Sequence, residues 1–122
     1  MQHEARYRRW LDEEAEARRL EDRRQEARRR LDQALSEEGV GKRCGSAEAL
    51  QRVQALEQLL ERSLAFYLGH AANDDGFLLG AFGPARTREL GERLATRKLA
   101  LMNELDRVRE TRHRLASDGA GG

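Results

Sequence analysis

Residues 47–72 read AEALQRVQALEQLLERSLAFYLGHAA, the most apolar stretch of the chain with a helical repeat. Large apolar residues recur every three or four positions, which places them on one face of an α-helix. Further leucine and phenylalanine residues widen that face beyond a narrow stripe. We therefore predict a helix here, at the centre of the hydrophobic core. Its repeating positions are Leu50, Val53, Leu56, Leu60, Leu64 and Tyr67.

The N-terminal part of the chain predicts a second helix, because residues 3–37 contain no glycine and no proline. Ten arginines and ten acidic residues are distributed along it, and pairs such as Glu14 and Arg18 stand four apart with the acid first. Each such pair stabilises a helix by about 0.2–0.5 kcal/mol. The apolar stripe has the spacing of a coiled coil but is narrow and rich in alanine. The seam of heptad positions is broken by Glu13 and Arg24 and reads Trp10, Ala17, Leu20, Arg24, Ala27, Leu31 and Ala34.

Two breaks divide the chain into three helices. Residues 39–45 read GVGKRCG, and so many glycines end a helix. Residues 73–76 read NDDG, a turn sequence whose acids are placed to cap the next segment. Pro84 suits a first helical position, and residues 84–117 again carry a stripe of helical spacing. Residues 118–122 read DGAGG and predict a disordered tail. The third stripe contains Leu90, Leu94, Leu101, Leu105, Val108 and Leu115, with Leu99 and Met102 beside it.

The composition favours an all-α protein. Charged residues make up 37% of the chain and aromatic residues 5%, there is no isoleucine, and only three residues are valine. A β-sheet needs many β-branched and aromatic side chains, whereas Ala, Leu, Glu and Arg favour helices. We predict a single helical domain over residues 1–117, with helices near 3–37, 47–72 and 84–117. They form either a closed bundle or a coiled-coil hairpin from which the N-terminal helix projects.

The same sequence disfavours secreted and membrane-spanning proteins. Cys44 is the only cysteine, so no disulfide can form within the chain, and this fits a reducing compartment. Residues 1–10 are charged and lack the apolar segment of a secretory signal. No run of 18 apolar residues is present. We therefore expect a cytoplasmic protein that is not inserted in a membrane.

No motif predicts catalysis, a metal or a cofactor. His70, Asp74 and Asp75 are of the right type for metal ligands, but the other two histidines belong to other helices, and a capped turn explains the aspartates. Residues 39–42, GVGK, lack the further glycine and the preceding strand that a phosphate-binding loop requires. Cys44 has cationic neighbours that favour a thiolate, although an exposed loop cysteine without a role is the simpler interpretation. We expect a non-catalytic protein without a cofactor.

Two apolar groups are candidate contacts with another protein. One is aromatic and lies near the N-terminus, where Trp and Tyr are typical of binding hot spots. The other is residues 77–83, FLLGAFG, which either close the end of the bundle or present an apolar patch. We predict a protein–protein interaction module, such as an adaptor, chaperone-like protein or assembly subunit, that binds another protein or forms a homodimer. The predicted contact residues are Tyr7, Trp10, Leu11, Phe77, Leu78, Leu79 and Phe82.

A nucleic-acid-associated accessory factor is the alternative function. Residues 84–117 carry nine basic and five acidic residues, 9 − 5 = +4, whereas the whole chain has a net charge of +1. A basic helix face attracts phosphate. Aromatic residues that would stack on bases are not interleaved with these arginines. The alternative predicts one continuous, unpaired basic face made by Arg86, Arg93, Arg97 and Arg107.

Overall fold

The computed structural model describes residues 2–38 and 45–120 and confirms the all-α prediction, since every regular element in these ranges is a helix. The loop at 39–44, which includes Cys44, lies outside the described residues, as do residues 1 and 121–122. The elements are α1 over Gln2–Glu38, α2 over Gly45–Leu68, the 3₁₀ helix η1 over Ala71–Asn73, and α3 over Asp75–Ala120.

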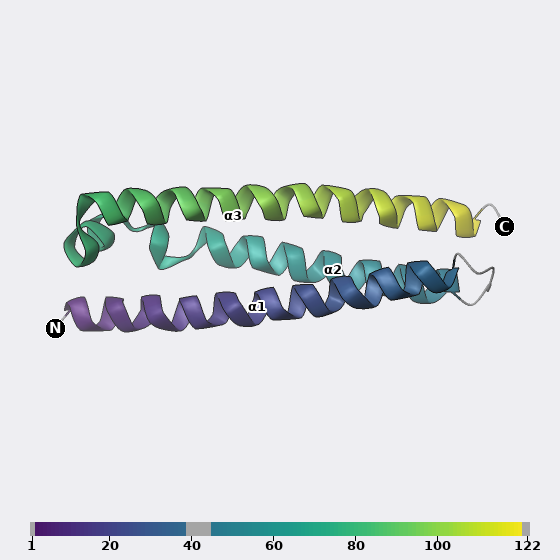
Figure 1. The fold of residues 1–122 in the computed structure, drawn as a ribbon, viewed down its shortest axis with the longest axis horizontal. Coiled ribbons are helices and arrows are strands. Elements are labelled where there is room, and N and C mark those ends of the chain that lie inside the picture. The colour runs from purple at the N-terminus through teal and green to yellow at the C-terminus, as the bar shows by residue number, and fades with distance from the viewer. Residues whose placement is uncertain (1, 39–44, 121–122) are drawn as a thin grey trace.

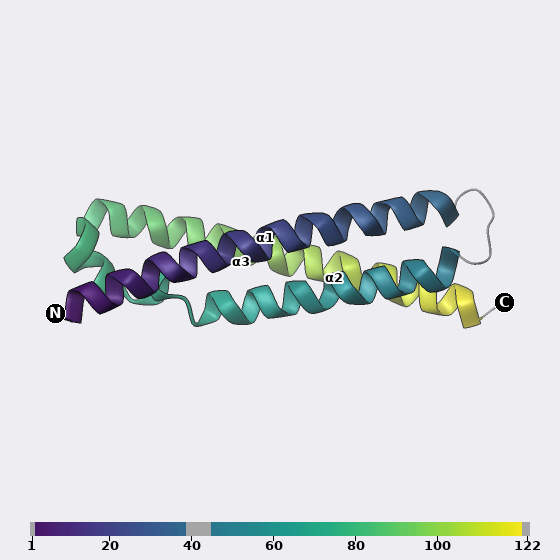
Figure 2. The same cartoon turned by 90° about the horizontal axis from the view of Figure 1, so that it is seen from below.

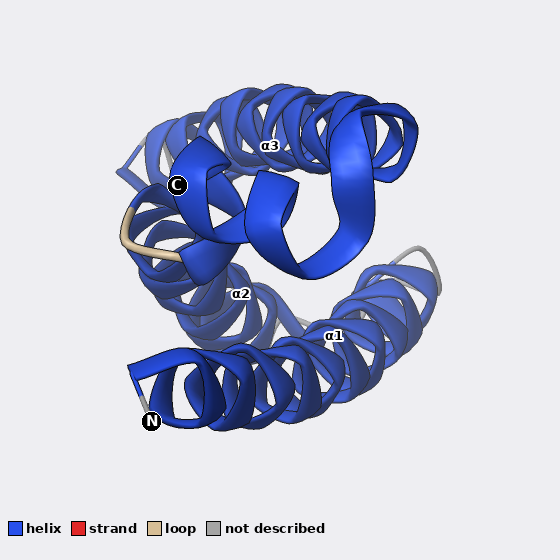
Figure 3. Cartoon of the chain, turned by 90° about the vertical axis from the view of Figure 1, so that its left-hand side faces the viewer, coloured by secondary structure: helices blue, strands red, loops and turns tan. Residues whose placement is uncertain are grey.

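The three long helices run up, down and up along a common axis (Figures 1 and 2). The middle helix, α2, packs against both α1 and α3, whereas α1 and α3 have few contacts with each other. Seen from the end, α1 and α3 lie on different sides of α2 (Figure 3). The N-terminal helix therefore packs back along α2, and the chain is a helical bundle with α2 at its centre.

The core lies along α2, as its apolar face predicts. Val53, Leu56 and Leu60 are completely buried, and Tyr67 continues the same face to the end of the helix. The narrow stripe of α1 contributes mainly small residues, which let α1 approach α2 closely but bury little area. Further core residues include Ala17, Leu31 and Ala34 from α1 and Leu94, Leu101, Leu105, Val108 and Leu115 from α3.

Charged pairs join helices across the edges of this core. Glu57 of α2 is buried to 6% exposure, and its carboxylate lies 3.3 Å from Arg109 and 3.1 Å from Arg112, both on α3. Arg28 of α1 reaches Glu104 of α3 at 2.8 Å. A buried carboxylate is tolerated only with such partners. These pairs fix how α3 is placed against the other two helices.

The second helix ends four residues before its predicted limit, at Leu68 instead of residue 72. His70 leaves the helical region with φ −68° and ψ 144°, and its Nδ1 accepts a hydrogen bond from the Ala72 backbone N–H. His70 thereby caps η1, and the chain turns. The apolar pattern continues past Gly69, so periodicity alone could not reveal this corner.

The third helix begins earlier than predicted, at Asp75 instead of Pro84. The Asp74 side chain accepts a hydrogen bond from the Phe77 N–H, which confirms that acids of the NDDG turn cap the next segment. Residues 75–82, which the sequence placed outside its three predicted helices, are helical and join the rest of α3 at a kink. Gly83 makes that kink with φ 81° and ψ 171°.

Two further expectations about α3 need correction. The helix continues to Ala120, so the predicted tail at 118–122 is helical over its first three residues. The final turn needs no core contact of its own, because its N–H groups bond to carbonyls four residues earlier. Leu99 and Met102, which the sequence placed beside the buried stripe, are 59% and 53% exposed because they lie on the face directed away from α2.

Candidate protein-binding surface

The two apolar groups that the sequence singled out meet at one end of the bundle. Both the start of α1 and the start of α3 lie at that end (Figure 1). The ring of Phe82 lies 5.1 Å from the ring of Trp10 and 6.3 Å from that of Tyr7. Tyr7 and Trp10 stack at 6.1 Å, and Phe77 meets Phe82 edge-on at 6.3 Å. Four rings from distant parts of the sequence thus form one aromatic cluster.

The cluster is buried on one side and open on the other. Phe77 and Leu78 are 2% and 0% exposed, so they close the end of the bundle and are not accessible to a partner. Their predicted contact role does not hold in this fold, because residues 75–82 form an amphipathic helical turn that directs them inward. Tyr7, Leu11 and Leu79 remain 44%, 46% and 50% exposed.

We use the name end surface for the five predicted contact residues that stay wholly or partly exposed. Tyr7 and Leu11 lie four residues apart on α1, and Leu79 and Phe82 lie three apart on α3, so each pair shares a helix face. Leu68, at the end of α2, is a further apolar residue at this end and is 70% exposed. The sequence assigned it to the core because it continues an apolar run. The end surface consists of Tyr7, Trp10, Leu11, Leu79 and Phe82.

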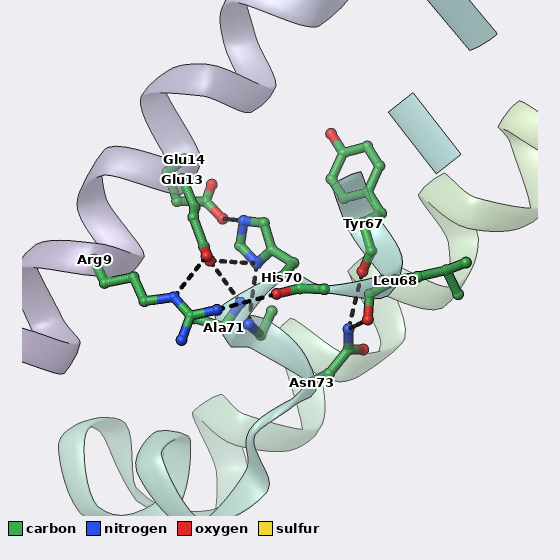
Figure 4. A network of polar contacts seen from close by, with 10 residues as sticks. Arg9, Glu13, Glu14, Tyr67, Leu68, His70, Ala71 and Asn73 are labelled. Carbon is green, nitrogen blue, oxygen red and sulfur yellow. Dashed lines mark hydrogen bonds and ion pairs between the residues drawn. The ribbon is translucent and has the colours of Figure 1, made fainter. Parts of the chain in front are cut away.

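A polar corner holds α1 against the turn between α2 and α3 (Figure 4). The Glu13 carboxylate accepts a hydrogen bond from the Ala71 N–H at 2.6 Å and pairs with Arg9 at 2.9 Å. Arg9 also donates to the Gly69 carbonyl at 3.3 Å. These contacts fix the first third of α1 relative to the corner. They position the rings of Tyr7 and Trp10, which lie on the same N-terminal turns of α1.

His70 is the buried centre of this corner, with its side chain 1% exposed. Its Nδ1 accepts from Ala72 N–H, so the neutral ring carries its proton on Nε2, which lies 3.3 Å from the Glu14 carboxylate. Burial lowers the pKa of His70 below its ordinary value, although the charges of Glu13 and Glu14 act in the opposite direction. The ring is therefore neutral near pH 7, and its role here is structural. No pattern in the sequence indicates that carboxylates of α1 face this histidine.

Among the described residues, two buried side-chain nitrogens in this region have no hydrogen bond, Nε2 of His70 and Nε1 of the Trp10 indole. Its Nε1 is buried and has no partner among the described residues. A buried Trp N–H usually finds an acceptor, so the fold leaves this donor unsatisfied. The indole thus combines an apolar face in the cluster with an unused polar edge.

The basic residues of α3 do not form the continuous unpaired face that nucleic-acid binding predicts. Arg86 and Arg93 both pair with Glu89, at 2.9 and 2.7 Å. These pairs lower the pKa of the Glu89 carboxyl, chiefly through its hydrogen bond to Arg86. Arg97 and Arg107 are exposed on the same helix. Because Glu89 lies between Arg86 and Arg93 and pairs with both, an acidic residue interrupts the predicted basic face.

The described part of the chain contains no group of three or more His, Cys, Asp or Glu side chains that could hold a metal ion. His70 and Asp74, which the sequence considered as ligands, each cap a helix, through Nδ1 of His70 and Oδ1 of Asp74. Among the described helices, none has the length and apolar character required to cross a bilayer.

No family model, curated protein or solved structure matches this chain.

Proposed function

We propose that the protein is a non-catalytic helical interaction module that binds another protein through its end surface. The observation that carries this proposal is the convergence of the α1 and α3 aromatics into one cluster. Phe77 packs inside the cluster while Tyr7 stays 44% exposed, and Leu11 and Leu79, on the two helices that carry the rings, are 46% and 50% exposed. Apolar side chains that gather on the surface of a small protein are typical of contact sites.

The chemistry of the end surface favours a partner that contributes apolar side chains. Trp and Tyr anchors are typical of binding hot spots. A standard interface has roughly 20–30 residues a side, so the five residues of the end surface would form the anchoring centre of a larger contact. The corner around Glu13 and His70 holds these anchors in place before binding, which reduces the entropy cost of association.

The alternative, nucleic-acid binding through α3, has weaker support. The pairing of Arg86 and Arg93 with Glu89 reduces the positive charge available to phosphate. A salt-sensitive association with DNA or RNA that is lost in an Arg97→Ala, Arg107→Ala variant would favour the alternative.

Site-specific photo-crosslinking in extracts of the source cells tests the proposal. A photoreactive residue is introduced at Leu11 or at Leu79, which lie on different helices of the end surface. The matched control carries it at Gln54, an exposed position on α2. We expect the same protein to be crosslinked from positions 11 and 79 and not from position 54.

Two results would contradict the proposal. One is crosslinking from position 54 with the same products as from 11 and 79, because this would indicate non-specific contacts. The other is the absence of any protein product from both positions of the end surface. If the same protein is crosslinked from positions 11 and 79, it is then used in affinity measurements with purified variants.

A further inference from the structure

The first turns of α1 are held to the bundle by few contacts. Among the described residues of α1, the buried core begins at Ala17, so the segment before it depends on the aromatic cluster and the polar corner. In that corner the Glu13 carboxylate accepts from the Ala71 N–H at 2.6 Å, and Arg9 donates to the Gly69 carbonyl at 3.3 Å. Both contacts end on the turn around η1. The placement of the segment therefore depends on the conformation of that turn.

One ring nitrogen of His70 fixes the conformation of the turn (Figure 4). Its Nδ1 accepts a hydrogen bond from the Ala72 N–H at 3.0 Å and so caps η1. A neutral imidazole has one acceptor nitrogen, whereas a protonated ring has two donors and no acceptor. Protonation would therefore place an N–H of the ring against the N–H of Ala72, and the cap would be lost.

The same proton would disturb the contact between Glu13 and the turn. The Glu13 Oε2 atom, which accepts from the Ala71 N–H, lies only 3.8 Å from Nδ1 of His70. A positive ring would attract this carboxylate, because opposite charges then compete with its hydrogen bond to the backbone. One protonation thus acts against the hydrogen bonds of both backbone N–H groups, at Ala71 and at Ala72.

Charged and titratable groups face His70 from all three long helices. The Glu14 carboxylate comes within 3.3 Å of Nε2, but Nε2 makes no hydrogen bond. The side chain is 1% exposed, and burial lowers the pKa of His70 more than the two nearby carboxylates raise it. A charged ring is therefore disfavoured where the ring now lies. The facing groups are Glu13, Glu14 and Arg9 of α1, Tyr67 of α2, and Arg97 of α3.

We propose that protonation of His70 is an acid switch, which releases the start of α1 from the polar corner and so takes the end surface apart. Tyr7 and Trp10 would leave with the released segment, whereas Phe82 stays on α3. The part of α1 from Ala17 onward remains packed in the core. The loss of partner binding in mild acid rests on the proposed function, but the release itself is a property of the free protein.

The direction of the pH dependence follows from the two states of the corner. In the closed corner the pKa of His70 is lowered, whereas in the released state the ring is open to water and its pKa is near the ordinary 6.5. The released state therefore binds the proton more readily, and the corner is held fully above pH 6.5. Below it, the ratio of released to closed corner rises by at most about tenfold per pH unit, until the pH reaches the folded-state pKa.

Two optical signals followed from pH 7.5 down to 4.5, the ordinary pKa of a glutamate, test the switch. The emission maximum of Trp10 reports the release, because it is the only tryptophan and lies in the released segment. Far-ultraviolet circular dichroism reports the helices as a whole. His70→Asn supplies an oxygen that accepts from an N–H two residues ahead and does not titrate. His113→Asn, at an exposed position of α3, is the matched control.

In the wild type and His113→Asn, we expect the emission maximum to move to longer wavelength below pH 6.5 while most of the helical signal remains. In His70→Asn the maximum should stay in place over the same range. The proposal is overturned if His70→Asn shifts at the same pH as the wild type, or if the wild type shows no shift down to pH 4.5.

A wild type whose emission and helical signal change together would also overturn the proposal, because acid would then unfold the whole chain. This comparison of two signals in the wild type decides the question even if His70→Asn does not fold. The proposed function fails separately, since photo-crosslinking needs a partner and the acid titration does not.

Discussion

The centroid of the Trp10 ring lies 5.1 Å from that of Phe82, and their planes are inclined by 54°. This contact joins the first turns of α1 to the last turn of α3 before the kink at Gly83. Two apolar segments that lie far apart in the sequence, the one near the N-terminus and residues 77–83, therefore share one surface. The rest of the fold, including the polar corner at His70, holds the two segments in this relationship.

Phe82→Ala is expected to remove the closest ring contact of the only tryptophan in the chain. The emission of Trp10 should then shift to longer wavelength, because water reaches the indole. We expect the free energy of unfolding to fall by about 1–3 kcal/mol, below the loss for a fully buried phenylalanine. Leu79→Ala, on the same helical turn but half exposed, should leave the emission maximum in place. An unchanged emission maximum in Phe82→Ala would contradict the cluster.

Gly83→Ala and Gly91→Ala should change stability in opposite directions. An added Cβ meets nothing within 4 Å at either position, so packing does not distinguish them. Gly83 has φ 81° and ψ 171°, a region that other residues enter at a cost of about 1–3 kcal/mol. Gly91 is helical, and alanine there should stabilise α3 by roughly 0.5–1 kcal/mol. Thermal unfolding of both variants is the measurement. Equal effects would show that the kink does not depend on the Gly83 conformation.

The buried His70 predicts a loss of stability in mild acid. Its folded-state pKa is lowered by burial, so the unfolded chain, with a pKa near its ordinary value of 6.5, binds a proton more readily. Neutral, buried His70 therefore makes its full contribution to the free energy of unfolding above pH 6.5. That contribution is lost as the pH falls from 6.5 through the lower folded-state pKa of His70. His70→Gln should remove this part of the pH dependence.

The measurement is urea unfolding of the wild type and His70→Gln at several pH values from 7.5 downward. His113→Gln is the control, because His113 is exposed on α3. The difference between wild type and His70→Gln should shrink as the pH falls. A difference that is constant with pH would show that protonation of His70 does not oppose folding.

Leu31→Ala tests the packing of α1 along α2. Leu31 is 1% exposed on the narrow stripe, so its truncation should cost about 2–5 kcal/mol of unfolding free energy. Leu11→Ala, on the same helix but 46% exposed, should change it by no more than about 0.5 kcal/mol. Equal small losses in denaturant unfolding would mean that α1 is not docked in solution.

The sequence predicted the features that depend on local patterns. The stripe of α2, the cap at Asp74 and the alanine-rich stripe of α1 all follow from spacing and composition. It did not predict the corner, because the end of α2 depends on a His70 side chain that bonds two residues ahead. It also placed Leu99 and Met102 beside the core, since periodicity does not tell which flank of a stripe faces a neighbouring helix.

The candidate contact residues were identified by residue type, but their grouping needed the fold. Trp10 and Phe82 are distant in sequence, and only the antiparallel return of α2 brings them together. The burial of Phe77 and Leu78 could not be inferred either, because the sequence of 77–83 fits both a closing segment and an exposed patch. The kink at Gly83 decides between them by allowing residues 75–82 to fold over the end of the bundle.

The central claim is that the end surface binds a protein, and the most direct test is the affinity of the crosslinked partner for purified variants. Calorimetric titration would compare the wild type with Tyr7→Ala and Leu79→Ala, and with Leu99→Ala as a matched exposed control. We predict that each end-surface variant weakens binding by more than about 1 kcal/mol, roughly fivefold or more in Kd, while a second control at the exposed position 54, Gln54→Ala, binds as the wild type does. Affinities for Tyr7→Ala and Leu79→Ala equal to those of the wild type and Gln54→Ala would contradict the claim.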